Sequence, residues 1–281
     1  MTAIVIPEYG DVNHALVCLR SLREAGISNY FVIVVDHGTT HETGEMVRCE
    51  FPDTIVLTAD SSLWWSGATN VGIRHAMTLG VEYVLLLNSD TVVTPLFLDR
   101  LTETAKQNPR HIVSSIVCFR DRPTIIRYAG GRIRWVTGNV VSTYYGMPES
   151  LLPKTAFQSD WAGGMGVLVP IELFRSVGLF DEKSFPHYAG DQDLWLRAKK
   201  EGFRLLVEPR SKIWVDDSHT GSKIRSIRNT WDFVKLLFDP KFHENIPTTL
   251  RFYFRHCPFY ALPSGLLIHY LRNALRVFKA T

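Results

Sequence analysis

The first hundred residues alternate short apolar runs with stretches in which apolar residues recur every three or four positions. Four continuous runs rich in β-branched residues predict fully buried strands, at residues 3–6, 31–35, 54–57 and 83–87. Two stretches between them have helical spacing and end at glycine, at residues 15–25 and 68–79. This alternation predicts βαβ units and a mostly parallel sheet. Ligands of such sheets bind beyond the carboxyl ends of the strands, here residues 7–10, 36–39, 59–65 and 88–90.

The pattern changes after Ile112. Two runs separated by Gly138 and Asn139 predict an antiparallel hairpin, at residues 125–135 and 140–145. A further strand is expected at 163–169, helices at 171–176 and 191–201, and short strands at 203–207 and 212–215. We therefore expect an α/β domain whose parallel half binds a nucleotide and whose mixed half shapes the second substrate site.

The last sixty residues are helical and amphipathic in pattern. We expect one domain over residues 1–222 and a C-terminal extension over 223–281, in which Phe, Tyr and Leu alternate with arginine and lysine. Such a segment can lie in a membrane interface. It can equally pack its apolar face against the catalytic domain or against a second copy of the chain.

Composition fits one ordinary globular core: 281 residues, 46% apolar, 21% charged, with a net charge of +3. The charge is uneven, because residues 210–281 contain twelve Lys and Arg against five Asp and Glu. The four cysteines form no short-spaced pair, so neither a zinc knuckle nor a redox motif is indicated. The N-terminus lacks a signal-peptide pattern and no run of about 18 apolar residues occurs, so we expect a cytoplasmic protein without a spanning helix.

Two acidic motifs carry the candidate chemistry. A buried strand ends in Asn88-Ser89-Asp90, where a hard divalent cation holding a diphosphate could be bound. These residue types are also the commonest turn formers. Asp191 and Asp193 lie at the start of a predicted helix. They could simply stabilise the N-terminus of that helix, with Asp191 as the N-cap. Alternatively, a carboxylate here could accept a proton from a substrate hydroxyl.

A third motif follows the second predicted strand. Asp36 can hydrogen-bond a base or ribose there, and Gly38 permits close backbone approach. No G-x-G-x-x-G and no G-x-x-x-x-G-K-[ST] occurs, which argues against dinucleotide dehydrogenases and P-loop enzymes.

These motifs occur in one order that resembles the family-2 inverting glycosyltransferases of the GT-A fold, especially the bacterial rhamnosyltransferase-like branch. The matching segments are residues 4–9, 34–40, 70–76, 84–91, 161–164, 177–182 and 191–197. The resemblance covers roughly residues 2–230 and depends on the ordered set rather than on one motif.

The resemblance implies a role for individual residues. Asp90 would hold Mg²⁺ or Mn²⁺, with His219 or the competing Asp217 completing the site, and Asp191 would be the catalytic base. The residues expected to bind the donor nucleotide are Pro7, Tyr9, Asp36, Gly38, Asn70, Arg74, Asn88 and Ser89. The residues expected on the acceptor side are Trp64, Trp65, Trp161, Gly163, Gly164 and Asp193. Arg74 could instead form a surface ion pair.

Two positions depart from the family pattern. Asn88 leaves only one carboxylate in the metal motif, and Gly190 stands where a Glu commonly precedes the base. Both departures keep open the alternative of a non-catalytic glycan-binding or scaffold relative. A sugar-nucleotide nucleotidyltransferase is a separate alternative, since it also uses a nucleotide-binding α/β sheet and a metal carboxylate, but no Gly-rich loop followed by a basic residue lies near the first strand to hold a triphosphate.

The expected reaction is a single displacement with inversion. The donor expected from the resemblance is dTDP-rhamnose, and the acceptor is a growing surface glycan on a polyprenyl diphosphate lipid. A basic aromatic extension agrees with a peripheral position on the cytoplasmic face of the inner membrane, and a homodimer through the same helices is the alternative.

Overall fold

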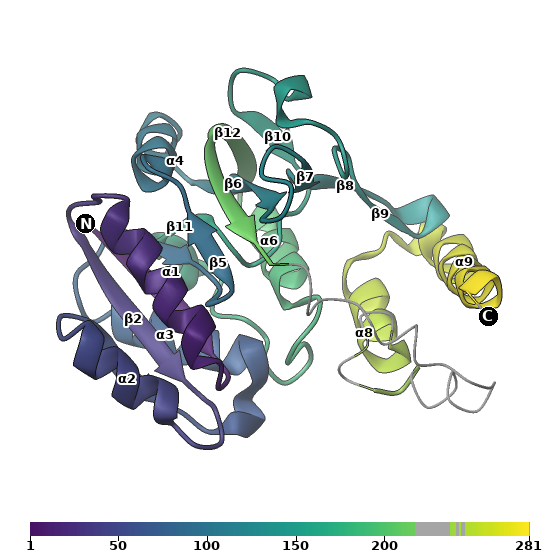
Figure 1. Ribbon diagram of the computed structural model, residues 1–281. Coiled ribbons are helices and arrows are strands. Elements are labelled where there is room, and N and C mark those ends of the chain that lie inside the picture. Colours follow the sequence, from purple (N-terminus) through teal and green to yellow (C-terminus); the bar gives the residue numbers. More distant parts are fainter. Residues whose placement is uncertain (217–236, 240–241, 243–244, 281) are drawn as a thin grey trace.

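A ten-stranded mixed sheet forms the centre of the molecule (Figure 1). The computed structural model describes residues 1–216, 237–239, 242 and 245–280. Its first elements are β1 (Thr2–Glu8), α1 (Val12–Glu24), β2 (Tyr30–Asp36), α2 (Glu42–Glu50), β3 (Ile55–Thr58), η1 (Ser61–Leu63), α3 (Trp64–Ala76) and β4 (Tyr83–Leu86). The elements that follow are β5 (Thr91–Val93), α4 (Phe97–Gln107), β6 (His111–Phe119), β7 (Ile126–Tyr128), β8 (Gly131–Arg134), β9 (Asn139–Ser142), β10 (Phe157–Ser159), β11 (Val167–Pro170), α5 (Ile171–Ser176), α6 (Gly190–Lys200) and β12 (Arg204–Val215).

The strand order is β10-β12-β6-β11-β4-β1-β2-β3, with β5 added to β12 and β7 to β6. Strands β4, β1, β2 and β3 are parallel neighbours, and Glu8 at the end of β1 lies opposite Asp36 at the end of β2. β11 runs antiparallel to both β4 and β6, which makes the second half mixed. The loops after β1, β2 and β4 therefore open at one edge of the sheet.

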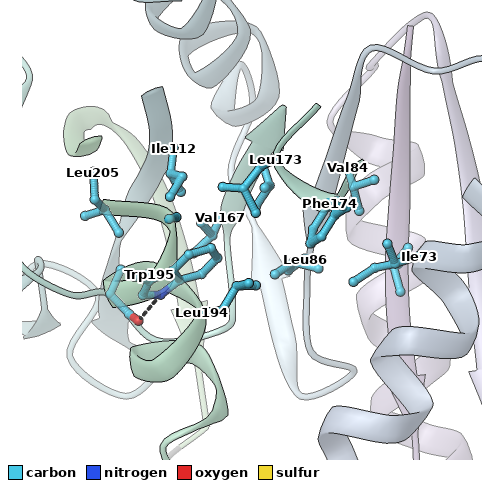
Figure 2. Packing of buried hydrophobic residues seen from close by; sticks show 14 of the residues in the cluster. Ile73, Val84, Leu86, Ile112, Val167, Leu173, Phe174, Leu194, Trp195 and Leu205 are labelled. Carbon is cyan, nitrogen blue, oxygen red and sulfur yellow. Dashed lines mark hydrogen bonds between the residues drawn. The ribbon is translucent and has the colours of Figure 1, made fainter. Parts of the chain in front are cut away.

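Helices cover both faces of the sheet. Apolar residues of α1, α2 and α4 pack with Ile4 and Val34 on one face. Figure 2 shows the opposite face, where Ile73 of α3 and Trp195 of α6 pack on Leu86 and Val167. The Trp195 indole donates a hydrogen bond to the Ala162 carbonyl at 2.9 Å, which satisfies its polar atom inside the core.

Helix α3 approaches β1 closely because residue 72 is glycine. A Cβ there would lie 2.4 Å from Cγ1 of Val5. Overpacking of this kind costs about 1–3 kcal/mol. The close contact fixes the start of α3, and hence Trp64 and Trp65, beside the open edge of the sheet.

The predicted strands and helices of the parallel half are confirmed, with shifts of a few residues at their ends. Helix α3 begins at Trp64, four residues earlier than its apolar pattern indicated. In the mixed half, one prediction is wrong and the hairpin prediction is confirmed in part. Residues 203–207 and 212–215 belong to one strand, β12, whose register shifts between Glu208 and Lys212. Of the hairpin, only β8 and β9 pair, because Ile126–Tyr128 pairs with β6 instead.

The C-terminal segment contains α8 (Ile246–His256), a short turn η5 (Phe259–Ala261) and α9 (Leu262–Ala280). In Figure 1 these yellow helices lie at the end of the molecule remote from α2 and β2. Arg272 of α9 donates to Asn139 Oδ1 at 2.6 Å and to the carbonyl of Thr137 at 2.7 Å, which ties α9 to the β8–β9 hairpin. The expected boundary at residue 222 lies outside the described residues. Within the described residues, no helix combines the length and hydropathy that crossing a bilayer requires.

Candidate active site

A cavity of about 610 Å³ opens beyond the carboxyl ends of β1, β2 and β4. Seven residues singled out in the sequence meet there, namely Pro7, Tyr9, Trp64, Trp65, Asn88, Ser89 and Asp90. Seven further residues complete the lining, namely Glu8, Asp11, His14, His37, Ser61, Ser62 and His187. The volume lies in the range of small-molecule and cofactor sites.

Asp90 contributes a half-buried carboxylate to this cavity, and the Oδ1 atom of that carboxylate is buried. In the part of the chain that the structure describes, its Oδ1 atom has no hydrogen-bond partner. Burial raises the pKa of Asp90, as does the nearby charge of Asp216, while His14 and Arg127 partly oppose the shift. A buried carboxylate oxygen without a partner is unfavourable unless a cation or a hydrogen-bond donor satisfies it. Asp90 Oδ1 is therefore a candidate to contact a bound ligand or ion.

Asn88 is held by the neighbouring tryptophan. The Trp65 indole Nε1 donates to Asn88 Oδ1 at 2.9 Å. The same ring meets Phe180 edge-on and lies against Gly164, where a Cβ would be 2.3 Å from Trp65 Cη2. Gly164 therefore makes room for Trp65, which gives it a packing role beside the cavity rather than a contact with the acceptor.

Trp64 enters α3 with a left-handed backbone (φ 54°), and its ring lies 5.7 Å from that of His187. This conformation is costly for a bulky residue and is typical of sites where surrounding contacts enforce it. Packing around Trp64 thus holds this part of the cavity wall in an unfavourable backbone conformation.

Glu8 and His37 line the cavity, although the sequence alone suggests no role for either side chain. Both are almost fully buried, and among the described residues Glu8 Oε2 and His37 Nδ1 find no hydrogen-bond partner. Burial raises the pKa of Glu8 to about 7, with Ser89 and the Asp11 amide opposing. Burial lowers the pKa of His37 to about 4, with the Asp36 charge opposing. Two signals in the sequence cover both residues: the rule that ligands bind at strand ends, and the matching segments 4–9 and 34–40.

Asp36 lies below the cavity and does not line it. Its carboxylate accepts from the backbone N–H of Gly38 at 3.1 Å and of Gly44 at 2.7 Å. The second contact satisfies an N–H in the first turn of α2. Gly38 packs tightly on Gly10, where a Cβ would lie 3.1 Å from the Gly10 nitrogen. A contact of Asp36 and Gly38 with a nucleotide stays a prediction. In the structure, both residues shape the loop after β2.

Two α3 residues do not reach the cavity. Asn70 is buried, accepts from Phe180 N at 3.0 Å and donates to Phe180 O at 2.9 Å and Glu182 Oε2 at 2.6 Å. The expectation of a donor contact is therefore corrected: Asn70 anchors the segment that precedes α6. Arg74 is exposed on α3 and is not among the residues lining the cavity.

Asp191 lies in the first turn of α6, half-buried, and its Oδ1 accepts from Gln192 N at 2.8 Å. Burial raises the pKa of the Tyr128 hydroxyl; Arg127 opposes this shift, and the negative charges of Asp191 and Asp90 add to it. Gly190 is packed against α3, and a Cβ there would lie 2.7 Å from Ser66 Oγ. This contact explains why the position usually held by Glu carries no side chain here.

Asp193 requires a correction. It is fully buried, ion-paired to Arg197 and Arg255 and within hydrogen-bond distance of His256, so its carboxylate is not available to an acceptor. Gly163 accommodates the Tyr128 ring, because a Cβ would lie 2.7 Å from the Tyr128 hydroxyl. Trp161 bridges to Gly131 outside the cavity.

The cavity fits a divalent cation in part. Within the described residues, no three His, Cys, Asp or Glu side chains cluster as a ready metal site. Asp90 Oδ1 is nevertheless the kind of unsatisfied hard oxygen that Mg²⁺ or Mn²⁺ uses when phosphate and water supply the other ligands. His219 and Asp217, the two candidates for a further ligand, lie outside the described residues.

A doubly covered, mostly parallel sheet with a cavity of charged, polar and aromatic residues at its strand ends is the arrangement of a nucleotide-binding α/β protein. Family comparison is specific: the family described as glycosyl transferase family 2 matches residues 3–160, and glycosyl transferase family group 2 matches residues 83–280. The chain belongs to glycosyl transferase family 2.

Curated relatives are distant. The chain is 24% identical over 204 residues to the uncharacterized glycosyltransferase RT0329 of Rickettsia typhi, covering 70% of this chain and 58% of that protein. It is 22% identical to the dTDP-rhamnosyl transferase RfbF of Shigella flexneri, covering 75% and 67%. It is 25% identical to the N-acetylglucosaminyl-diphospho-decaprenol L-rhamnosyltransferase of Mycobacterium tuberculosis, covering 77% and 76%.

Solved structures confirm the GT-A fold. GalNAc-T7 with UDP, GalNAc and Mn²⁺ superposes with a TM-score of 0.60 at 14% identity, covering 85% of this chain and 49% of that chain. The mannosyltransferase PcManGT from Pyrobaculum calidifontis, in complex with GDP-Man and Mn²⁺, gives 0.56 at 18% identity, covering 95% and 73%. The chain thus spans about half of the first of these proteins.

Proposed function

We propose that this protein transfers a sugar from a nucleoside diphosphate donor to an acceptor hydroxyl, with inversion at the anomeric carbon. The observation that carries the proposal is Asp90, which lines a nucleotide-sized cavity at the strand ends and whose buried Oδ1 atom has no hydrogen-bond partner among the described residues. Family membership supports the reaction class, and the fold provides the expected position for the donor.

Asp90 would hold Mg²⁺ or Mn²⁺ against the donor diphosphate. When bound, the ion stabilises the charge that develops on the leaving nucleoside diphosphate. Tyr9, with its exposed ring at the cavity mouth, and Pro7 would contact the nucleoside portion.

Asp191 would act as the general base. A carboxylate at the N-terminus of α6 can take the proton from the acceptor hydroxyl as the new bond forms, which contributes about 10²- to 10⁴-fold. Asp191→Asn should reduce transfer by that factor and leave donor affinity unchanged, as measured by product formation and by calorimetry with donor and Mn²⁺. Asp53→Asn, on an exposed loop, is the matched control. Near-normal turnover by Asp191→Asn would remove Asp191 from the mechanism.

The donor proposed is dTDP-rhamnose, and the acceptor is a glycan on a polyprenyl diphosphate lipid. The names of the Shigella and mycobacterial relatives support both choices at low identity. Calorimetry with dTDP-rhamnose, UDP-glucose, UDP-GlcNAc and GDP-mannose in the presence of Mn²⁺, followed by transfer assays, tests the choice. Binding without turnover by any donor would favour a non-catalytic glycan-binding relative.

We further propose that the C-terminal helices rest on the anionic cytoplasmic face of a membrane. Phe259 and Tyr260, in the turn between α8 and α9, are 91% and 80% exposed, and Phe254 is 68% exposed. The excess of basic residues after position 210 agrees with an anionic surface.

Sedimentation with phosphatidylglycerol and phosphatidylethanolamine vesicles tests this position. The double variant Phe259→Ser/Tyr260→Ser should bind about tenfold more weakly, because it withdraws two aromatic side chains from the interface. Leu151→Ser removes an apolar residue that is 62% exposed elsewhere and should bind normally. A dimer that the double variant disrupts, with no vesicle binding by the wild type, would instead assign the surface to self-association.

A further inference from the structure

The helix that carries the proposed base is joined to the C-terminal segment by a buried charge cluster. Asp193, in the first turn of α6, has no exposed surface. Its Oδ2 accepts from Arg197 Nε at 2.8 Å, and its Oδ1 contacts Arg255 Nη1 at 3.0 Å and His256 Nε2 at 2.8 Å. Arg255 and His256 both come from α8, more than sixty residues further along the chain.

Helix α8 also grips the segment that leads into α6. Arg255 Nη1 pairs with Asp181 Oδ2 at 2.7 Å, and its guanidinium lies over the Phe185 ring at 5.1 Å. Phe252, one turn earlier, packs edge-on against the same ring. Arg255 thus pairs with Asp181 before the segment that leads into α6 and with Asp193 after it, in the first turn of α6.

The backbone between these contacts is constrained. Ala189 has φ 63° and ψ 0°, a left-handed conformation that costs an L-residue about 1–2 kcal/mol. Its side chain packs against a small apolar cluster formed by Phe185 and by Phe252 and Tyr253 of α8. Gly190, next in the chain, is pressed against Ser66 of α3. Residues in such conformations persist where the surroundings over-determine them. Asp191 therefore follows a strained turn held by α3 on one side and by α8 on the other.

We infer that α8 is part of the catalytic apparatus, with Arg255 and His256 as positioning residues that orient Asp191 through Asp193. The inference rests on the proposed role of Asp191. None of these residues lines the donor cavity as the described part of the chain forms it, so they act on the transfer step and not on donor binding. The C-terminal segment is then more than an anchor, because its first helix completes the acceptor side of the site.

The test compares turnover with donor affinity in the full chain. Arg255→Met should lower kcat about tenfold, equivalent to about 1.4 kcal/mol of transition-state stabilisation, and leave the Kd for donor with Mn²⁺ within twofold. Arg251→Met is the control, since Arg251 lies one turn earlier on α8 and donates to the Ser184 carbonyl at 3.4 Å; it should retain wild-type kcat. Thermal melts establish that each variant is folded at the assay temperature.

Arg255→Lys decides the question if Arg255→Met does not fold, because it keeps the charge and loses the geometry that joins Asp181 to Asp193. A reduced kcat with unchanged donor Kd supports the inference. Wild-type kcat in a folded Arg255 variant overturns it, as does a loss of donor affinity equal to the loss of kcat. Asp191→Asn separates this failure from that of the proposed function: if it is inactive while Arg255→Met turns over normally, only the positioning role is lost.

Discussion

Buried carboxylates occur in two regions of this molecule, and their surroundings are opposite. At the cavity, Glu8 and Asp90 each keep one oxygen without a hydrogen-bond partner among the described residues, and burial raises the pKa of both. At the junction of α6 and α8, burial alone would raise the pKa of Asp193, but His256, Arg197 and Arg255 lower it. The comparison distinguishes Glu8 and Asp90, which are candidates to bind a ligand, from Asp193, whose partners within the protein stabilise the fold.

The largest expected effect is the contrast between two identical substitutions. Asp193→Asn should lower the free energy of unfolding by about 3 kcal/mol, because it removes the buried carboxylate that pairs with Arg197 and Arg255 and contacts His256. Asp90→Asn should leave it unchanged or slightly higher, because it removes a buried charge whose Oδ1 atom has no hydrogen-bond partner in the described chain. Urea denaturation at pH 7 measures both.

Donor affinity should rank the two variants in the opposite order to stability. Asp90→Asn should lose Mn²⁺-dependent donor affinity, whereas Asp193→Asn, measured where it is folded, should bind donor normally. Equal destabilisation by both substitutions would show that the two regions do not differ as the contacts indicate.

The next effect concerns pH and sharpens the comparison within the cavity. The pKa of Glu8 is raised to about 7, so the stability that its neutral form contributes is lost as pH rises from 4.5 to 7. The pKa of His37 is lowered to about 4, so the stability contributed by its neutral ring is lost as pH falls from 6.5 to 4. Each shift corresponds to about 3 kcal/mol.

Two variants separate the pH dependence of stability due to Glu8 from that due to His37. Relative to wild type, Glu8→Gln should become progressively more stable between pH 4.5 and 7, and His37→Asn progressively more stable between pH 6.5 and 4. Denaturant titrations across pH 4–8 measure the differences. A constant offset across that range for either variant would mean that the group titrates at its ordinary pKa.

The sequence predicts the paired and unpaired acids unequally. Hydrophobic periodicity locates β1, β2 and β4, and the rule for parallel sheets locates their open ends, so the amino-acid sequence alone places Asn88, Ser89 and Asp90 at the ligand-binding edge. From the sequence, Asp193 is expected on the acceptor side, and its buried pairing could not be predicted because its partners Arg255 and His256 are distant in sequence. Glu8 and His37 belong to the correct segments, but their unpaired atoms depend on burial, which no motif encodes.

The smallest predicted effect tests Asn88, the neutral member of the cavity motif. Its Oδ1 accepts from the Trp65 indole, so it belongs with the paired groups although it lines the cavity. Trp65→Phe and Asn88→Ala each remove this hydrogen bond. A double-mutant cycle should give a coupling free energy of about 1 kcal/mol, the usual net value of one hydrogen bond between neutral groups.

Trp195→Phe provides the control for that cycle, because its indole donates to the Ala162 carbonyl in the core cluster rather than to Asn88. Combined with Asn88→Ala it should be additive to within about 0.5 kcal/mol. A Trp65–Asn88 coupling no larger than this control would mean that the amide is not held by the indole. Asn88 would then belong with Glu8 and Asp90, as a third cavity group whose oxygen is directed at the donor or its cation.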